Sequence, residues 1–404
     1  MSTTRTSRSP DAVVIGGGIV GCAVAWFLSR AGLRVTLLDR DAIAGGTSGC
    51  CMGHLMVTAD HDMLHALTSR SVTLWNRMFD EIGSIERRMT GALYLAEDES
   101  DLSLLDRLQG DFARHGEASQ RLDGQALREL EPALAEDLPG GLFYPRDGVV
   151  LPMQAAGRMA ADARRLGAEV RPFTPVTGLR LGAGRRVEAV LTPDGAIPTT
   201  NVVNAAGVFA PALTELAGLG RAPIHPRRGD LAITNARTAP IRTQLIEVSY
   251  LRVAHGSTKV DPTGRVPDPG AQAMNVQPQS NGSCLIGSTR QFVGMDRRVD
   301  PALLRHSLRR AARYVPALAQ AQITRTWAGL RPWTSDKLPI VGPVDAVPGF
   351  HMAAGHEGLG ITLAPITGEL VMQAMTGAKP SIALEPLALV RFSAEMTTKG
   401  GTNG

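Results

Sequence analysis

Two glycine-rich motifs, one near each end of the chain, have the residue types and spacing to hold a large anionic ligand. The first, Gly16-x-Gly18-x-x-Gly21, directly follows the apolar run 12–15. Glycine permits a tight turn there and lets the backbone approach a pyrophosphate, which the positive end of the following helix attracts. The motif therefore predicts a dinucleotide site.

The second motif covers residues 355–362, Gly-His-Glu-Gly-Leu-Gly-Ile-Thr, and is again a glycine-rich turn before an apolar helical stretch. A chain that returns from its far end to build such a turn can close over the other end of a long cofactor. FAD needs this second wall, whereas NAD usually does not. The pair of motifs therefore favours FAD.

The segments around the first motif are those of a nucleotide-binding β-α-β unit. Residues 12–15 predict a buried strand, residues 19–30 a helix, and residues 34–38 a second strand that ends at Asp39. Asp39 lies 18 residues after Gly21, where a carboxylate can accept hydrogen bonds from ribose hydroxyls and disfavours a 2′-phosphate. This carboxylate argues against NADP, and the order strand, motif, helix, strand and acid is a specific sign of a dinucleotide site.

Length and charge narrow the class of protein. A chain of 404 residues favours two domains over one. Its 42 basic and 38 acidic residues nearly balance, at a net charge of +4. The arginine pairs at 164–165, 227–228 and 309–310 are scattered, and we interpret them as solvated surface. The charge pattern gives no indication of nucleic-acid binding.

The cysteines and the chain ends bear on the compartment. Four cysteines show neither a CxxC motif nor a disulfide framework, which fits a reducing cytosol. Residues 1–10 are polar and predict a disordered tail rather than a signal peptide. The apolar runs are too short to span a bilayer. We therefore expect a cytoplasmic protein, with peripheral contact at the inner face of the membrane left open.

Several middle segments carry small or polar residues of interest. Residues 45–54 can run close to a flat ligand, with Thr47 and Ser48 offering hydroxyls, although an ordinary loop is the alternative. Residues 254–270 are rich in Gly, Pro and Asp and predict either a mobile loop over a substrate site or disorder. His61 and His65 have a metal-ligand spacing, but without a third ligand we favour a helix start and predict no metal site.

The ordered set of motifs resembles the D-amino-acid oxidase superfamily of flavoproteins, which includes glycine oxidase, sarcosine oxidase and bacterial D-amino-acid dehydrogenases. The resemblance extends from about residue 11 to about 390 and rests on Gly16-x-Gly18-x-x-Gly21, Asp39, Thr47-Ser48, residues 204–207 (Asn-Ala-Ala-Gly), 329–332 (Gly-Leu-Arg-Pro) and 355–368. Within it, residues 51–55, Trp75 and residues 326–339 resemble bacterial hydroxyproline dehydrogenases, which oxidise cis-4-hydroxy-D-proline. Relatives with other secondary-amine substrates share much of this pattern.

The resemblance implies an α/β fold with a glutathione-reductase-like Rossmann FAD-binding domain and an inserted α+β, mixed-sheet substrate domain. The implied FAD-binding segments are 11–88, 150–222 and 325–392. The implied substrate-binding segments are 89–149 and 223–324, with tails at 1–10 and 393–404.

The resemblance also implies which residues hold FAD. Near the pyrophosphate and adenosine it places Gly16, Gly18, Ile19, Val20, Gly21, Asp39, Arg40, Val176, Ala206 and Gly207. Along the flavin it places Thr47, Ser48, Met52, Gly53, His54, Gly355, His356, Glu357, Gly358, Leu359, Gly360, Ile361 and Thr362. Relatives with covalent FAD carry a cysteine near the position of Arg331, and no cysteine follows Cys284 here, so we expect non-covalent FAD.

The implied reaction is oxidation of an amino acid at its Cα–N bond, with hydride transfer to flavin N5 and an imino acid as product. Arg331 falls where relatives bind the substrate carboxylate, and a guanidinium can hold it in a bidentate fork. A structural ion pair is its alternative. His54 could face substrate or pack on the flavin, and Glu357 could bind substrate or support the flavin loop. Tyr250 is a candidate substrate contact, with core packing favoured.

The best substrate prediction is a cyclic secondary amine such as cis-4-hydroxy-D-proline or D-proline. A D-amino-acid dehydrogenase, or a glycine or sarcosine oxidase, is the nearest alternative. A non-catalytic flavoprotein subunit is another, although Arg331 argues mildly against it. A tRNA-modifying oxidase would want a fused methyltransferase domain and a basic groove, and neither is visible. The electron acceptor, oxygen or a respiratory quinone, and assembly into homo- or hetero-oligomers stay open.

Overall fold

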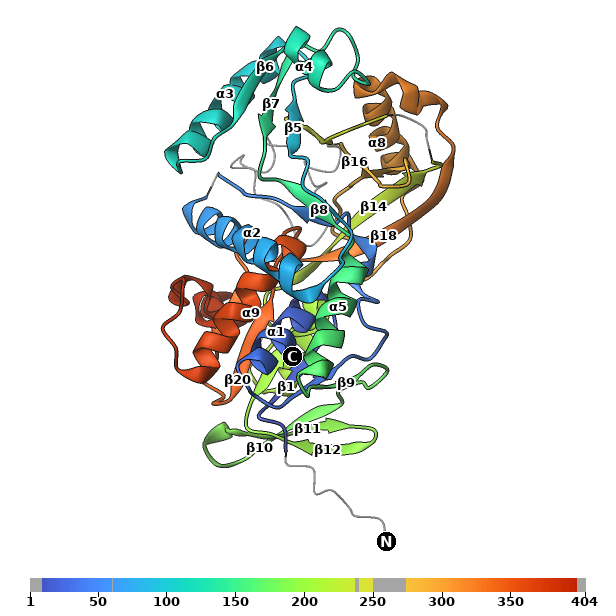
Figure 1. Cartoon of the computed structure of the whole chain (residues 1–404). Helices are drawn as coiled ribbons and strands as arrows, with labels where there is room; N and C mark the ends of the chain where they lie inside the picture. Colours follow the sequence, from blue (N-terminus) through green and yellow to red (C-terminus); the bar gives the residue numbers. More distant parts are fainter. Residues whose placement is uncertain (1–8, 60, 237–239, 250–273, 398–404) are drawn as a thin grey trace.

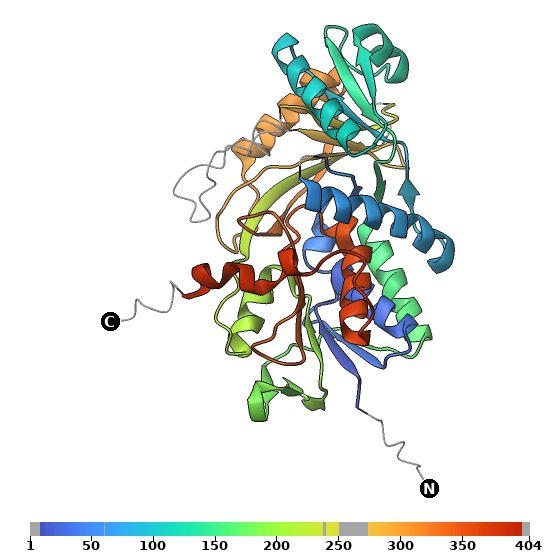
Figure 2. The same ribbon diagram turned by 90° about the vertical axis from the view of Figure 1, so that its left-hand side faces the viewer.

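The computed structural model describes residues 9–59, 61–236, 240–249 and 274–397. Its two largest sheets have six and eight strands and lie in the lower and upper halves of Figure 1. The long paired strands β14 (His225–Thr234) and β18 (Ile323–Trp333) run between these halves, as both views show (Figures 1 and 2). The described helices are α1 (Ile19–Arg30), α2 (Asp62–Ile82), α3 (Glu99–Arg114), α4 (Gly124–Leu130), α5 (Pro152–Arg165), α6 (Ala210–Leu216), α8 (Pro301–Tyr314), α9 (Gly360–Thr376) and α10 (Ser393–Thr397).

The six-stranded sheet collects strands from distant parts of the sequence. Its order is β19 (Ile340–Pro343), β20 (Phe350–Ala354), β13 (Val202–Asn204), β1 (Ala12–Ile15), β2 (Val35–Leu38) and β9 (Glu169–Arg171). All neighbours are parallel except β19 and β20. A parallel sheet has both faces covered, and the four inner strands β20, β13, β1 and β2 are accordingly buried along their whole length.

Strand β1 shows how the two faces are filled. Ala12 and Val14 pack into a core with α1, α5 and α9, whereas Val13 and Ile15 pack with α6 and a small antiparallel sheet. That sheet is an antiparallel meander of β10 (Gly178–Leu181), β11 (Val187–Thr192) and β12 (Gly195–Pro198). The first glycine motif therefore directly follows a strand that is buried on both faces, and this packing fixes the position of the motif.

The eight-stranded sheet is mixed. Its order is β18, β14, β17 (Cys284–Gly287), β16 (Asn275–Pro278), β15 (Gln244–Glu247), β5 (Ala92–Leu95), β7 (Gly140–Tyr144) and β6 (Gln120–Asp123), with β15 and β5 parallel and the other pairs antiparallel. Apolar residues of α4 and α8 cover one face. A third sheet joins β3 (His54–Leu55), β8 (Gly148–Val150) and β4 (Arg87–Arg88).

One local detail agrees with the sequence predictions, and another differs from them. The cap of α2 is His61, whose Nδ1 accepts from the Leu64 N–H at 3.4 Å, so the helix-start interpretation of that histidine holds and Asp62 is the first helical residue. Residues 393–397 form α10 instead of the predicted tail, because Met396 packs against the core that holds β13 and β20. The predicted domain boundaries stay a prediction.

Candidate active site

A cavity of about 530 Å³ extends from the end of β2 to one face of the eight-stranded sheet. The N-termini of α1 and α9 both open onto it, through residues 18–20 and 359–361. The caps of these helices are Gly18 and Leu359, whose side chains hold no acceptor. Two positive helix ends therefore face one cavity, as an extended anionic cofactor requires.

The glycines of the first motif are fixed by close packing. Gly16 has φ of 113°, and a Cβ built there would lie 2.5 Å from the Ala205 carbonyl oxygen. A Cβ at Gly21 would lie 1.8 Å from the Gly16 carbonyl oxygen. Gly21 therefore brings α1 against the turn after β1, and it is not among the residues that line the cavity.

Residues 46–54 form the next part of the wall. Ser48 Oγ accepts from the Ile19 N–H at 3.0 Å, which ties this segment to the start of α1. Thr47 Oγ1 donates to the Leu330 carbonyl at 2.6 Å, so its hydroxyl joins the segment to β18, although Thr47 also lines the cavity. The short helix η1 (Thr47–Cys50) lies beside β18, where a Cβ on Gly329 would be 3.0 Å from Cys50 Cβ. Cys50 is thus near Arg331 in space, which the sequence did not indicate.

The turn before α9 packs against the end of β18. The Glu357 N–H donates to the Pro332 carbonyl at 2.9 Å. Glu357 has φ of 47°, in the left-handed region that non-glycine residues rarely adopt. Such backbone strain is held in place by surrounding packing and clusters at functional sites. The turn therefore presents Glu357 to the cavity in one fixed position.

Both histidines in the wall are neutral. Burial lowers the pKa of His356 to about 3, and its Nε2 lies 2.9 Å from Thr367 Oγ1 within α9. Burial also lowers the pKa of His54 to about 4, and the neighbouring Gln277 side chain acts in the opposite direction. Neither imidazole carries a positive charge at neutral pH.

Arg331, near the end of β18, lies on the wall with its guanidinium directly over Gly229. A Cβ on Gly229 would be 2.5 Å from both terminal nitrogens of Arg331, so a side chain at position 229 would displace the guanidinium from this place. One terminal nitrogen donates to the Thr289 carbonyl at 3.2 Å, and the other donates to Ser288 Oγ. The cavity therefore has a fixed guanidinium on the side of the eight-stranded sheet.

Arg227 stands directly opposite Arg331 in the β14–β18 register, which brings two like charges together. Glu357 compensates them: its carboxylate lies 3.1 Å from Arg227 Nη1. Burial would raise the pKa of Glu357, but the charges of Arg227, Arg331 and Arg290 lower it overall. Glu357 is therefore an anion at neutral pH. Its lowered pKa makes it a weak base, which is poorly suited to remove a proton from substrate.

The interpretation of residues 227–228 as solvated surface is wrong, since Arg227 and Arg228 are 8% and 5% exposed. Both lie in β14, where successive side chains point to opposite faces of the sheet, so only Arg227 lines the cavity. Two adjacent arginines in a sequence suggest an exposed segment, because an arginine is rarely buried without an acidic partner. Their burial depends on acidic partners that come from residues 230, 296, 300 and 357.

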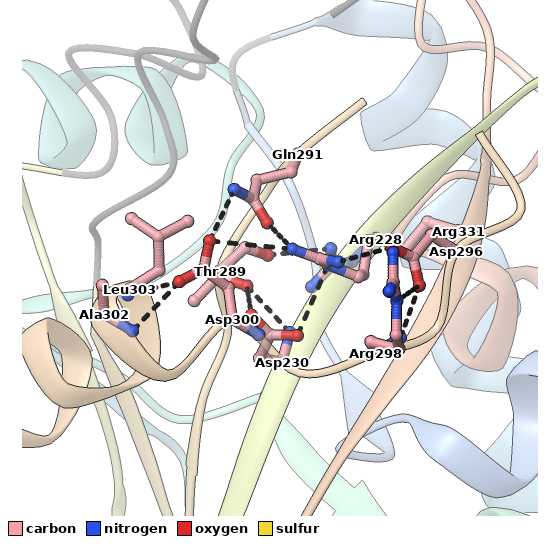
Figure 3. Close-up of polar contacts among 10 residues, drawn as sticks. All are labelled: Arg228, Asp230, Thr289, Gln291, Asp296, Arg298, Asp300, Ala302, Leu303 and Arg331. Atoms are coloured by element: carbon pink, nitrogen blue, oxygen red, sulfur yellow. Dashed lines mark hydrogen bonds and ion pairs between the residues drawn. The ribbon is translucent and has the colours of Figure 1, made fainter. Parts of the chain in front are cut away.

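A buried polar network supports Arg331 from behind (Figure 3). Thr289 Oγ1 donates to Asp230 Oδ2 at 2.9 Å and accepts from the Asp230 N–H at 2.8 Å. Arg228 lies 3.6 Å from Asp230, and Gln291 links it to Asp300, the cap of α8. The network fixes the segment 288–289 to which Arg331 donates, so the guanidinium keeps its orientation.

Most predicted site residues lie together on the cavity wall. They are Gly16, Gly18, Ile19, Val20, Asp39, Arg40, Thr47, Ser48, Met52, Gly53, His54, Val176, Ala206, Gly207, Arg331, His356, Glu357, Gly358, Leu359, Gly360 and Ile361. Gly21, Gly355 and Thr362 are not among the lining residues. Thr362 Oγ1 instead donates to the His54 carbonyl at 3.0 Å and holds β3 against α9. Tyr250 and residues 254–270 lie outside the described residues.

Other lining residues were not predicted, among them Tyr94, Arg227, Asn275, Ser288 and Arg290. None belongs to a motif with a recognisable spacing. They reach the cavity only because β5, β14, β16 and the segment after β17 are neighbours in one sheet. The alternation of side chains between the two faces of β14 was the one sequence signal that could have placed Arg227 on the cavity side. The same alternation occurs in any half-buried strand, so it does not single out this site.

Comparisons with known proteins decide the family. The model of the FAD-dependent oxidoreductase family called DAO matches residues 11–374. The chain belongs to this family. The hydrogen cyanide synthase subunit HcnC of Pseudomonas aeruginosa is 29% identical, over 96% of this chain and 98% of its own length. Glycine oxidase of Geobacillus kaustophilus is also 29% identical, over 94% of this chain and 97% of its own length.

Solved structures agree with this membership. L-proline dehydrogenase from P. horikoshii superimposes with a TM-score of 0.85 at 25% identity, covering 96% of this chain and 99% of that one. The crystal structure of glycine oxidase from Geobacillus kaustophilus gives a TM-score of 0.83 at 27% identity, covering 95% and 98%. The α/β fold with a nucleotide-binding sheet and a mixed substrate-side sheet is that of the family.

FAD is the cofactor of the family, and the residues present fit it. Asp39 and Arg40 line one part of the cavity, and the N-termini of α1 and α9, whose own cap residues offer no side-chain acceptor, open onto it. No Cβ at Gly46 or Gly207 would meet an atom within 4 Å, so both glycines border open space. The expectation that FAD is held without a covalent bond stays a prediction.

Asp147, which follows β7, is fully buried beside the cavity wall. Burial raises its pKa to about 8, although the Val57 N–H donates to Oδ1 at 2.9 Å and the Tyr94 hydroxyl lies 3.4 Å from Oδ2. Arg146 lowers the pKa, and Glu117 raises it. Val57 and Tyr94 both line the cavity, so the protonation of Asp147 bears on the wall itself.

This burial predicts a pH-dependent stability. Between the unfolded pKa of 3.8 and the folded pKa of about 8, the folded state binds a proton that the unfolded state has released. The free energy of unfolding should therefore fall as pH rises from about 4 to about 8. Asp147→Asn should make urea unfolding less sensitive to pH between 5 and 8.5. The exposed control Asp80→Asn should keep the wild-type slope, and an unchanged slope in Asp147→Asn would contradict the assignment.

Within the described residues, no three metal-ligating side chains cluster, and no helix is both long and apolar enough to cross a membrane. His65, considered above as a ligand, stacks on His115 with ring centroids 3.9 Å apart. Its Nδ1 lies 2.9 Å from the Thr58 carbonyl, so the ring has a packing role.

Proposed function

We propose that this protein oxidises an amino acid at the Cα–N bond to the imino acid, and that the substrate is a cyclic secondary amine such as cis-4-hydroxy-D-proline or D-proline. The observation that carries the proposal is the Arg331 guanidinium, seated over Gly229 on the cavity wall near the turn that precedes α9. Family membership supports amino-acid oxidation in general. The cyclic substrate rests on the sequence resemblance, and the likeness to a proline dehydrogenase structure is compatible with it.

In this proposal Arg331 binds the substrate carboxylate in a bidentate fork and so fixes which Cα substituent faces the flavin. Bound FAD supplies the acceptor for the hydride that leaves Cα. The neutral substrate amine provides the electron pair that forms the C=N bond, and its proton goes to solvent. No strong protein base is needed, which agrees with a Glu357 carboxylate held as an anion by Arg227 and with neutral His54 and His356.

The remaining named residues take supporting parts. Glu357 holds Arg227 and can also receive a hydrogen bond from the substrate amine. His54 borders both the flavin region and the substrate side. Tyr250 remains a candidate substrate contact by resemblance. FAD is held without a covalent bond, and the reduced flavin passes its electrons to oxygen or to a quinone of the respiratory chain, from a cytoplasmic protein that can contact the membrane peripherally.

A second candidate is a glycine oxidase-like enzyme acting on a small primary amine, or a D-amino-acid dehydrogenase. The glycine oxidase and the HcnC subunit at 29% identity favour it. Because HcnC is a subunit of its enzyme, this second candidate includes a possible partner chain.

Anaerobic mixing of the purified holoprotein with single amino acids separates these candidates. The absorbance of oxidised flavin near 450 nm should bleach rapidly with the D isomers of proline and cis-4-hydroxyproline, and slowly with glycine, sarcosine and acyclic D-amino acids. Fast bleaching by glycine or sarcosine alone would favour the second candidate. An FAD that no amino acid reduces would indicate a non-catalytic flavoprotein subunit.

A further inference from the structure

The corner of the cavity formed by β15 and β16 carries an uncharged polar side chain, in contrast to the arginines and the glutamate near Arg331. Ile246 and Asn275 are register partners in these strands, and both line the cavity. Leu245 and Val276 alternate with them and belong to the core on the other face of the sheet. Asn275 is therefore directed toward the cavity by the strand itself.

Several polar atoms in this corner are buried without a hydrogen-bond partner. They are Asn275 Oδ1 and both side-chain polar atoms of Gln244. Gln277 Oε1 and His54 Nε2 are buried as well, and these two side chains lie next to each other. Asn275 and His54 line the cavity, whereas Gln244 and Gln277 are not among its lining residues. Gln277 follows Asn275 by two residues on the same face, and the β15–β16 register puts Gln244 opposite it. Leaving such a group unpaired costs about 1–3 kcal/mol, so a ligand group that pairs with it is favoured.

The sheet register gives the separation between this corner and Arg331. The Arg331 guanidinium lies over Gly229 of β14. Leu231, two residues on, pairs with Gly287, and Gly287 pairs with Asn275. Two strand spacings of about 4.8 Å and one two-residue step of about 6.8 Å place Asn275 about 12 Å from Gly229. Subtracting one hydrogen bond of about 3 Å at each end leaves about 6 Å for the substrate.

We propose that Asn275, backed by Gln277 and His54, binds a neutral hydrogen-bonding substituent of the substrate, a hydroxyl or a carboxamide about four bonds from the carboxylate carbon. The 4-hydroxyl of a hydroxyproline has this separation. The polar atoms that converge on this corner come from carboxamides and a neutral imidazole, so an uncharged group suits it better than a second carboxylate or an amine. This inference rests on the proposed function, because it takes the substrate carboxylate to be on Arg331.

The test compares two substrates that differ by one hydroxyl, cis-4-hydroxy-D-proline and D-proline, in the holoenzyme. The wild type should prefer the hydroxylated substrate at least tenfold in kcat/KM, because a site that hydrogen-bonds a hydroxyl rejects the analogue that lacks it. Asn275→Leu should lower kcat/KM for the hydroxylated substrate about tenfold or more, and change that for D-proline by less than about twofold. Arg331→Lys is the matched control, and should lower both substrates by the same factor.

Equal losses for both substrates in Asn275→Leu, an unchanged preference, or a loss of bound FAD would each overturn the proposal. Asn275→Ala serves if the leucine variant does not fold, with a loss in the same direction expected. If the wild type oxidises neither cyclic amine, the proposed function fails on its own account. The subsite is then tested with homoserine against 2-aminobutyrate, which also differ by a hydroxyl four bonds from the carboxylate carbon. A preference for homoserine that Asn275→Leu abolishes would support the subsite, and no preference would overturn it.

Discussion

Arg331→Ala should raise the KM for amino-acid substrates by about 100-fold or more while FAD stays bound. Two charge-assisted hydrogen bonds to a carboxylate contribute about 1.5–3 kcal/mol each, and each 1.4 kcal/mol corresponds to a factor of ten. Loss of the fork also releases the substrate from its reactive orientation, so kcat should fall as well. Steady-state kinetics give both constants, and the flavin absorbance per protein gives the FAD content.

Two controls separate the carboxylate contact from general damage to β18. Arg331→Lys keeps the charge but not the fork, and should recover part of the lost affinity. Arg325→Ala removes an exposed arginine from the same strand and should leave the kinetics unchanged. Unchanged kinetics in Arg331→Ala would contradict the assignment and favour a structural role through Ser288 and Thr289. FAD released by acid from the wild type would further agree with a non-covalent cofactor.

Gly21→Ala should abolish stable FAD binding. The added methyl carbon would lie 1.8 Å from the Gly16 carbonyl oxygen, so α1 must move away from the turn that faces the cofactor. Overpacking of this kind costs about 1–3 kcal/mol and occasionally more. The purified variant should contain less than about a tenth of the wild-type FAD and should melt at a lower temperature, or should fail to accumulate as folded protein.

Gly157→Ala is the matched control for this change. Gly157 lies inside α5, and a Cβ there would meet no atom within 4 Å. Alanine in a helix interior is favoured over glycine by roughly 0.5–1 kcal/mol, so this variant should melt at the same or a higher temperature and keep its FAD. A Gly21→Ala protein with full FAD content and normal melting would show that the close packing does not govern cofactor binding.

The sequence predicted the cofactor end of the molecule well because its determinants are local. Strand 12–15, helix 19–30 and the turn between them are set by apolar periodicity and by glycines at fixed spacing, and the structure confirms these elements. The second motif likewise predicted a turn followed by a helix, and in the structure this helix begins at Gly360. In each case the residues that build the turn are adjacent in the chain.

The substrate side was predicted less completely. Arg331 was found because it stands in a motif, but Arg227 was taken for surface, and Ser288 and Asn275 were not considered. Arg227 is buried only because Glu357, 130 residues later, supplies its counter-charge. No local pattern around Arg227 predicts a contact with a residue so far along the chain.

By itself the sequence determined the cofactor, FAD, the two glycine turns, and the resemblance to enzymes that oxidise amino acids. Only the tertiary structure decided what faces the substrate, because strands β14, β16, β17 and β18 meet in one sheet whose register no single strand specifies. That register seats Arg331 over Gly229, and places Asn275 two strands away. The physical reason is that a nucleotide-binding turn is closed by contacts between near neighbours, whereas a substrate pocket is assembled from side chains whose proximity depends on long-range strand pairing.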